Sequence, residues 1–145
     1  MPFPVFPLFH ITGSVEVRYL YGEITTALGS NVTAAHFRLN DQTATDVVIT
    51  AAAGTTLSSA PAGSLILANV LAATALTLKT AAVGAMLQPA VVNTSIFSPS
   101  VFTQKTGGIT TDIEFVYTTN NTSLGVIKFY AKWIPLTENG NLEAV

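Results

Sequence analysis

Residues 109–118 read ITTDIEFVYT, and residues 127–133 read IKFYAKW. In both runs apolar and polar side chains alternate along the chain. Alternation with a period of two residues is typical of β-strands that bury one face and expose the other. The polar loop at 119–125 separates the two runs, so the pattern predicts a long antiparallel hairpin.

The charged residues of these runs fit the predicted hairpin. Lys128 and Lys132 would face Glu114 and Asp112 across its solvent side, where each opposite-charge pair contributes a few tenths of a kcal/mol. Pro135 then ends the second strand, because proline has no N–H to donate to a ladder.

Working outward, shorter runs of the same kind fill the remaining chain, separated by glycine, proline and asparagine. Gly22 is expected to end the strand that begins at residue 10, and the Ala-rich stretch 70–75 could instead hold a helical turn. Threonine, valine and isoleucine are frequent, and they favour strands. The sequence predicts an all-β domain of roughly eight to ten antiparallel strands, a β-sandwich or jelly roll. Expected strands lie at 10–21, 23–26, 32–39, 46–50, 90–97, 101–103, 109–118 and 127–133. The pattern is weaker at three further candidate strands, 65–70, 75–79 and 85–88.

The N-terminal residues 1–9 alternate proline with Phe or Val. Proline fixes its own φ and pushes the preceding residue to extended geometry, so the segment cannot be a helix. The segment also has no basic residue, whereas a signal peptide begins with a positively charged region. We therefore do not expect a signal peptide. We expect an extended apolar arm at 1–9, a β-sandwich domain at 10–135 and a C-terminal tail at 136–145. A disordered terminus is the alternative reading of the arm.

The composition indicates a chain that needs a partner. Only 10% of the residues are charged and 49% are hydrophobic, whereas an average soluble protein has roughly 25% charged residues. Another protein chain would cover the excess apolar surface, and a membrane is the competing explanation. The most apolar stretch, 65–78, is shorter than the roughly 20 residues that a transmembrane helix needs. We therefore expect protein partners and no membrane.

Direct nucleic-acid binding is not expected. The formal net charge is −2, and binding to phosphate backbones requires clustered positive charge. The basic residues are instead scattered along the chain, at Arg18, Arg38, Lys79, Lys105, Lys128 and Lys132.

The sequence offers little catalytic chemistry. His10 and His36 have no second histidine or carboxylate at ligand spacing, and the chain has no cysteine, so we expect no metal site and no cofactor. Asp112 and Glu114 share a strand face and could act as an acid–base pair, but neighbouring lysines favour a solvated charge ladder. No glycine-rich phosphate loop or nucleophile motif occurs. We expect no enzymatic activity.

Aromatic residues in the expected strands have two readings. Core packing is the first, and stacking against sugars is the second. The residues concerned are Tyr19, Tyr21, Tyr117, Tyr130 and Trp133.

Two segments carry a resemblance. Residues 22–29 read GEITTALG, and residues 127–136 read IKFYAKWIPL, followed by Gly140, Leu142 and Ala144 at fixed spacing. These segments resemble those of a group of small tailed-bacteriophage virion proteins, in which a G-E-[IV]-T-T-A-[LV]-G segment follows an early strand and a W/Y-x-P-L-x-x-x-G-x-[LV]-x-A segment closes the chain. The similarity is sharp at the two ends of the chain and concerns structural motifs.

The resemblance implies a capsid decoration (cement) protein on the outer surface of the virion capsid. Such a protein would bind the major capsid protein and copies of itself, as a dimer or trimer, and stabilise the joints between capsid subunits. A tail or spike component that binds host glycan is the alternative, and a small glycan hydrolase using Asp112 and Glu114 is a third hypothesis. The expected interface residues are Phe3, Pro4, Phe6, Pro7, Phe9, Leu136, Leu142 and Val145.

Overall fold

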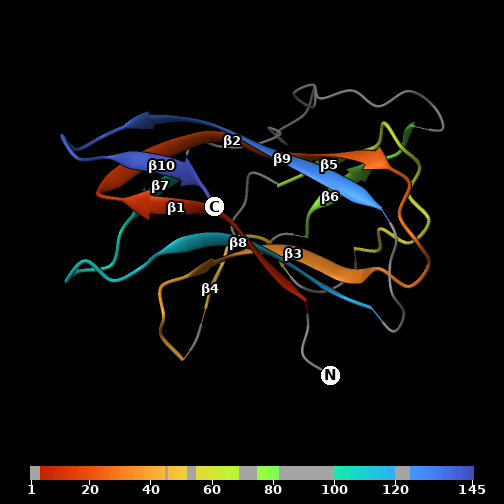
Figure 1. The fold of residues 1–145 in the computed structure, drawn as a ribbon, viewed down its shortest axis with the longest axis horizontal. Helices are drawn as coiled ribbons and strands as arrows, with labels where there is room; N and C mark the ends of the chain where they lie inside the picture. The colour runs from red at the N-terminus through yellow and green to blue at the C-terminus, as the bar shows by residue number, and fades with distance from the viewer. Residues whose placement is uncertain (1–3, 45, 52–54, 69–74, 82–99, 120–124) are drawn as a thin grey trace.

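The computed structural model describes residues 4–44, 46–51, 55–68, 75–81, 100–119 and 125–145, whose strands form two antiparallel sheets. Figure 1 shows the sheets as two layers, with β3 and β8 in one and β2, β5 and β9 in the other. Sheet A has the strand order β10 (Asn141–Ala144), β1 (Val5–Thr12), β8 (Asp112–Thr118), β3 (Thr33–Asn40) and β4 (Val47–Val48). Sheet B has the order β6 (Thr77–Lys79), β5 (Leu65–Leu67), β2 (Ser14–Thr26) and β7 (Ser100–Thr103), with β9 (Val126–Pro135) on the other edge of β2.

The core lies between the two sheets. Phe37 of β3 and Phe115 of β8 are almost fully buried. Phe129 of β9 packs on both, with ring centroids 5.9 Å from Phe37 and 4.9 Å from Phe115. This three-ring cluster joins sheet A to sheet B, and the inward faces predicted from alternation supply it. The all-β, two-layered expectation is therefore confirmed as a β-sandwich-like arrangement.

Strand β2 is longer and more irregular than the sequence predicts. It runs through Gly22, which lies opposite Phe129 of β9, and a Cβ added there would approach the Phe129 ring at 3.1 Å. The missing side chain makes room for the aromatic ring, so the expected break is wrong. The register with β9 shifts between Val17 and Tyr19. This bulge reverses which residues face inward, so Val17 is buried while Tyr19 is 45% exposed.

The N-terminal segment belongs to the sandwich from Val5 onward, which differs from the expected boundary at residue 10. Strand β1 pairs with β8 from Val5 to His10 and carries a register shift between Pro7 and Phe9. β10 covers the other edge of β1 only from Phe9 onward. Proline is tolerated at position 7 because no strand among the described residues requires its N–H there.

The expected hairpin of residues 109–133 is wrong. Strand β8 lies in sheet A between β1 and β3, whereas β9 lies in sheet B and pairs with β2. Lys128 and Lys132 therefore lie opposite Glu23 and Tyr19 of β2, far from the acids of β8. The predicted inward faces are nevertheless right, because alternation fixes the face of a strand without fixing its neighbour.

The other predicted strands fare as follows. The strand expected at 32–39 is confirmed as β3, and that at 101–103 is confirmed as β7, which begins one residue earlier. Those at 46–50, 65–70 and 75–79 are confirmed over shorter lengths among the described residues. Those at 85–88 and 90–97, and most of the alternative helical turn at 70–75, lie outside the described residues. The total number of strands remains a prediction.

The turn before β10 makes a close backbone contact. Gly140 N donates to the Thr137 carbonyl at 2.9 Å, and a Cβ added at Gly140 would collide with the backbone oxygen of Ser14. We expect Gly140→Ala to lower the free energy of unfolding by about 2 kcal/mol, because a backbone atom cannot swing aside. Gly107→Ala is the control, since a Cβ there meets open space and adds only the strain of a positive φ, about 1 kcal/mol. Equal losses in urea denaturation would contradict the collision.

Candidate functional site

The expected N-terminal interface residues lie on or beside β1. Phe3 lies outside the described residues, and Pro4 directly precedes the strand. Phe6 is 46% exposed and Pro7 is exposed, so both present apolar surface. Phe9 is partly buried and packs against the core, so its side chain supports the fold.

The expected C-terminal interface residues divide in the same way. Leu136 and Val145 are exposed, whereas Leu142 is 7% exposed and belongs to the core. Leu142 lies opposite Ile11 in the β1–β10 ladder, so its place in the expected interface is corrected to a core residue. Both chain ends meet in sheet A, where Val145 N donates to the Leu8 carbonyl at 3.1 Å. Figure 1 shows this C-terminus beside β1.

We call the exposed apolar residues of these segments, other than the inward-facing Phe6, the terminal surface, which comprises Val5, Pro7 and Val145. The pairing of β1 with β10 and the hydrogen bond of Val145 to Leu8 hold the C-terminal residues beside the second half of β1. The sequence suggested two separate straps, an arm and a tail. The structure joins them at one edge.

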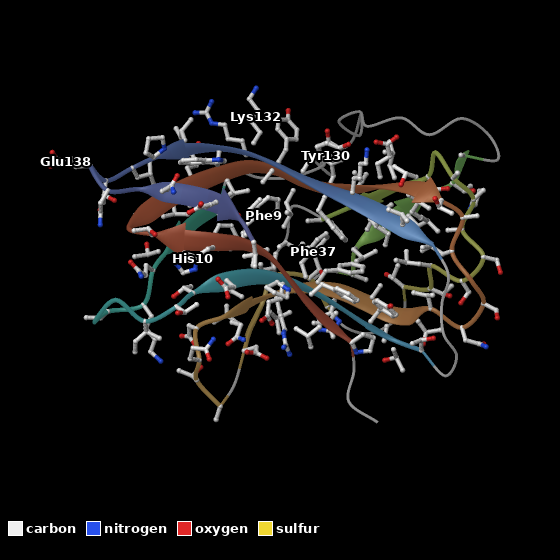
Figure 2. The ribbon with its side chains drawn as sticks, viewed as in Figure 1. Phe9, His10, Phe37, Tyr130, Lys132 and Glu138 are labelled. Carbon is white, nitrogen blue, oxygen red and sulfur yellow. The ribbon has the colours of Figure 1, made fainter. Side chains whose placement is uncertain are left out.

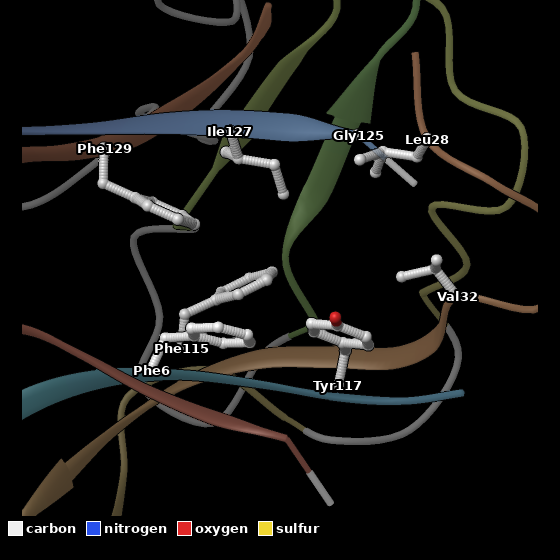
Figure 3. Close-up of a pocket in the computed structure, with 8 residues that line it drawn as sticks. All are labelled: Phe6, Leu28, Val32, Phe115, Tyr117, Gly125, Ile127 and Phe129. Carbon is white, nitrogen blue, oxygen red and sulfur yellow. The ribbon is translucent and has the colours of Figure 1, made fainter. Parts of the chain in front are cut away.

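A pocket opens between the sheets next to Phe6 (Figure 3). Its cavity volume is about 150 Å³. The hydroxyl of Tyr117 is the only polar side-chain atom of the lining residues, and the Phe6 and Tyr117 rings stack with centroids 5.8 Å apart. We call this the ring pocket. Its lining residues are Phe6, Leu28, Val32, Phe115, Tyr117, Gly125, Ile127 and Phe129.

Among the residues that line this pocket, sequence reasoning identified Phe6 as an interface candidate and Tyr117 as a residue that could stack against sugars. The lining comes from β1, β8, β9 and two connecting segments that are distant in sequence. Phe115 and Phe129 were assigned to inward strand faces, but no spacing along the chain indicates that a gap is left between them. The pocket follows from the tertiary arrangement alone.

A charged cluster occupies the outer face of sheet A. Arg38 Nε donates to Glu114 Oε2 at 2.7 Å, and Arg38 also forms an ion pair with Asp46 at 2.6 Å. Asn40 Nδ2 donates to the other Glu114 oxygen at 2.9 Å. The Glu114 side chain is only 6% exposed, so both of its oxygens are satisfied within the protein.

His10 and Asp112 form a second polar pair on this face. His10 Nδ1 lies 2.8 Å from Asp112 Oδ1, and the two residues are register partners in the β1–β8 ladder. The sequence indicated no partner for His10, because the carboxylate lies 102 residues away. Asp112 and Glu114 are thus engaged by His10, Arg38 and Asn40, and the predicted ladder with Lys128 and Lys132 is absent.

The outer face of sheet B carries the exposed tyrosines. Tyr21 and Tyr130 are cross-strand partners whose rings stack with centroids 5.0 Å apart. Figure 2 shows Tyr130 and Lys132 projecting from β9 away from the core, while Phe37 lies between the sheets. Tyr130 and Tyr19 are 37% and 45% exposed, so both can be reached from solvent.

Tyr130 has a perturbed acidity. Desolvation and the neighbouring Glu23 carboxylate, which accepts a hydrogen bond from the phenol at 3.3 Å, raise the pKa of Tyr130 above its usual 10.0. The folded state therefore favours the protonated phenol. This contribution to stability is complete below the usual pKa and is lost as pH rises through the folded pKa.

We expect Glu23→Gln to lower the pKa of Tyr130 part of the way to its ordinary value, because the desolvation remains. The pKa of Tyr130 is measured from the phenolate absorbance in an alkaline titration, after the titration of Tyr130→Phe has been subtracted to remove the other tyrosines. A Tyr130 titration unchanged by Glu23→Gln would contradict the assigned cause.

Within the described residues, no helix is both long and apolar enough to cross a membrane. The same part of the chain holds no group of three or more His, Cys, Asp or Glu side chains placed to bind a metal ion. In the pairs His10–Asp112 and Arg38–Glu114, each polar side chain already has a partner within the protein.

Comparison of the chain with protein-family models, with curated proteins and with solved structures finds no match.

Proposed function

We propose that this chain is a non-enzymatic structural protein of a phage virion, a capsid decoration (cement) protein that binds the outer shell and stabilises joints between major capsid subunits. The observation that carries the proposal is the large amount of apolar surface on a chain with 10% charged residues. Large hydrophobic side chains that are more than a third exposed occur on both sheets. They are Val5, Phe6, Tyr19, Val47, Val48, Val101, Ile109, Val126, Tyr130, Leu136 and Val145.

The topology supports a jelly roll as the finer description of the fold. Consecutive strands β1, β2 and β3 alternate between the sheets, and β8 inserts between β1 and β3. Such non-local order is produced by Greek-key connections, from which jelly rolls are built. Jelly rolls are common among viral shell proteins.

The proposed mechanism is mechanical. A decoration protein adds buried contact area across the joints of a shell that is under outward pressure. The terminal surface supplies apolar contacts, and Val5 and Val145 need not leave the fold to make them. Each joint requires only a few kcal/mol of added binding free energy, because many identical joints act together. The partners are the major capsid protein and further copies of this chain, as a dimer or trimer.

The test uses heads of the phage that encodes this chain, stripped of the protein and incubated with purified chain. We expect rebinding to the outer surface and an increased temperature of DNA release. The double variant Val5→Asp, Val145→Asp should lose occupancy, because it places charge on the terminal surface. Val101→Asp is the control, since Val101 is 62% exposed but lies on β7 in the other sheet.

Heads that do not rebind the wild-type chain, or equal occupancy by both variants, would contradict the proposal. Deleting the expected arm, residues 2–9, would not test the interface alone, because the deletion also removes five residues of β1.

The alternative function is host-glycan binding by a tail or spike component. The exposed Tyr19 and Tyr130, with Lys132 opposite Tyr19 in the ladder, favour it, because aromatic faces stack against sugar rings. A glycan array probed with wild type and with Tyr19→Ala, Tyr130→Ala tests this function. Binding that depends on the two tyrosines would support it, and an array without hits would remove it.

A further inference from the structure

The size and chemistry of the ring pocket define its ligand. A dry cavity of about 150 Å³ lined by aliphatic and aromatic side chains holds a benzene-sized group, and the ring pocket has this volume and this lining. Phe6, Phe115, Tyr117 and Phe129 supply aromatic neighbours from both sheets, as Figure 3 shows. An inserted ring could pack against them edge-to-face or in an offset stack. A phenylalanine side chain therefore fits the pocket.

The N-terminal sequence offers such a ring directly beside the pocket. Phe6 lines the pocket, and Phe3 precedes it by three residues, which is about 10 Å of extended chain. Phe3 lies between Pro2 and Pro4, which favour extended geometry. Less conformational entropy is lost when a pre-extended segment binds.

The strand pattern of the described residues bears on whether Phe3 would enter the pocket of its own chain. Phe6 is the register partner of Phe115 and shares its inward face, whereas Val5 is the partner of Val116 and lies on the outer face. In an extended segment, side chains an odd number of residues apart face opposite sides, so the sequence pattern predicts that Phe3 would not face the same side as Phe6. Pro4 disfavours the turn that would reverse this direction.

We propose that the ring pocket of one copy receives the Phe3 side chain of a second copy. Because the segment starts beside its own pocket, a two-fold axis near Phe6 lets each copy insert its ring into the other over a short distance. The inference rests on the self-association part of the proposed function and names the contact that produces it. Phe3, predicted above as an interface residue, then has a defined receptor.

The experiment measures self-association of the full-length protein by sedimentation equilibrium. We expect a wild-type dimer and roughly 10- to 100-fold weaker association for Phe3→Ala, because each exchange buries one aromatic side chain. Leu28→Trp should weaken it similarly by filling the pocket from its rim. Val101→Ala is the matched control for loss of an exposed hydrophobe, and its association should equal that of wild type.

The double variant Phe3→Ala, Leu28→Trp decides whether ring and pocket bind each other. If they do, the double variant associates no more weakly than either single variant, because both remove one interaction. Independent, multiplicative losses would overturn the proposal, as would a wild-type monomer or a dimer insensitive to Phe3→Ala. The Phe3→Ala variant leaves β1 intact, so a folding defect of Leu28→Trp does not obscure the result.

Benzene is a direct probe of the vacated pocket. It should raise the Tm of Phe3→Ala and leave the Tm of Leu28→Trp unchanged, and equal shifts would overturn the assignment of the ligand. Failure here is distinguishable from failure of the proposed function. Heads can still be bound through the terminal surface by a protein whose Phe3→Ala variant self-associates like wild type.

Discussion

Replacing Arg38 with methionine is expected to lower the free energy of unfolding by about 3 kcal/mol. The change keeps the length of the side chain but removes the guanidinium that binds Glu114 at 2.7 Å and Asp46 at 2.6 Å. Asp46 is partly exposed and can be hydrated, whereas the Glu114 side chain is 6% exposed and keeps only Asn40 among its described partners. An uncompensated buried carboxylate is the source of the loss, and urea denaturation measures it.

Arg18→Met is the matched control for Arg38→Met. Arg18 pairs with Glu16 at 2.8 Å, nearly the same distance, but the Arg18 side chain is 47% exposed. Its loss should cost below about 1 kcal/mol, because water solvates the remaining carboxylate. The double variant Arg38→Met, Glu114→Leu should return to within about 1 kcal/mol of wild type, since no buried charge remains. If Arg38→Met and Arg18→Met cost the same, burial is not the cause.

Replacing Phe37 with alanine is expected to lower the free energy of unfolding by about 4 kcal/mol. Phe37 is 0% exposed, and its ring packs on Phe115 at 5.3 Å and on Phe129 at 5.9 Å. The substitution therefore opens a cavity at the three-ring cluster that joins the two sheets. Thermal and urea unfolding measure the loss.

Phe6→Ala is the comparison for Phe37→Ala. Phe6 also packs on an aromatic ring, that of Tyr117, but it is 46% exposed, so we expect a loss of about 1 kcal/mol. A smaller loss for Phe37→Ala than for Phe6→Ala would mean that the cluster does not hold the sheets together.

The sequence predicts the fold class and the inward strand faces because both depend on local alternation. Ile113, Phe115 and Phe129 are on the faces that the pattern assigns to them. The outward direction of Tyr19 could not be predicted, because no residue pattern in the sequence indicates the bulge that shifts the register after Val17.

The sequence-based prediction failed mainly in which strands pair with one another. A short polar loop between alternating runs is a hairpin signal, but the same loop can carry the chain from one sheet to the other. Here β8 pairs with β1 and β3 while β9 pairs with β2, and these pairings depend on how the whole core packs. The His10–Asp112 pair could not be predicted either, because its two residues are 102 positions apart and meet only through the pairing of β1 with β8.

That the predicted residues form an interface stays a prediction, because the structure shows only which of them are exposed. Apolar residues at both chain ends were recognised from composition, and Phe6, Pro7 and Val145 are exposed as expected. Leu142 could not be separated from them, because whether an apolar residue faces a partner or the core depends on the strand beside it. The ring pocket has no local signature.

The pairing of the first strand with the last bears on how the chain is made. Ala144 lies opposite Phe9, so sheet A cannot be completed until the residues of β10 have been synthesised. Contacts between residues so distant in sequence slow folding, and nascent chains stopped before β10 would expose the edge of β1 to other unfinished copies. A chaperone that covers the edge of β1 until β10 has emerged from the ribosome should therefore raise the yield of native protein.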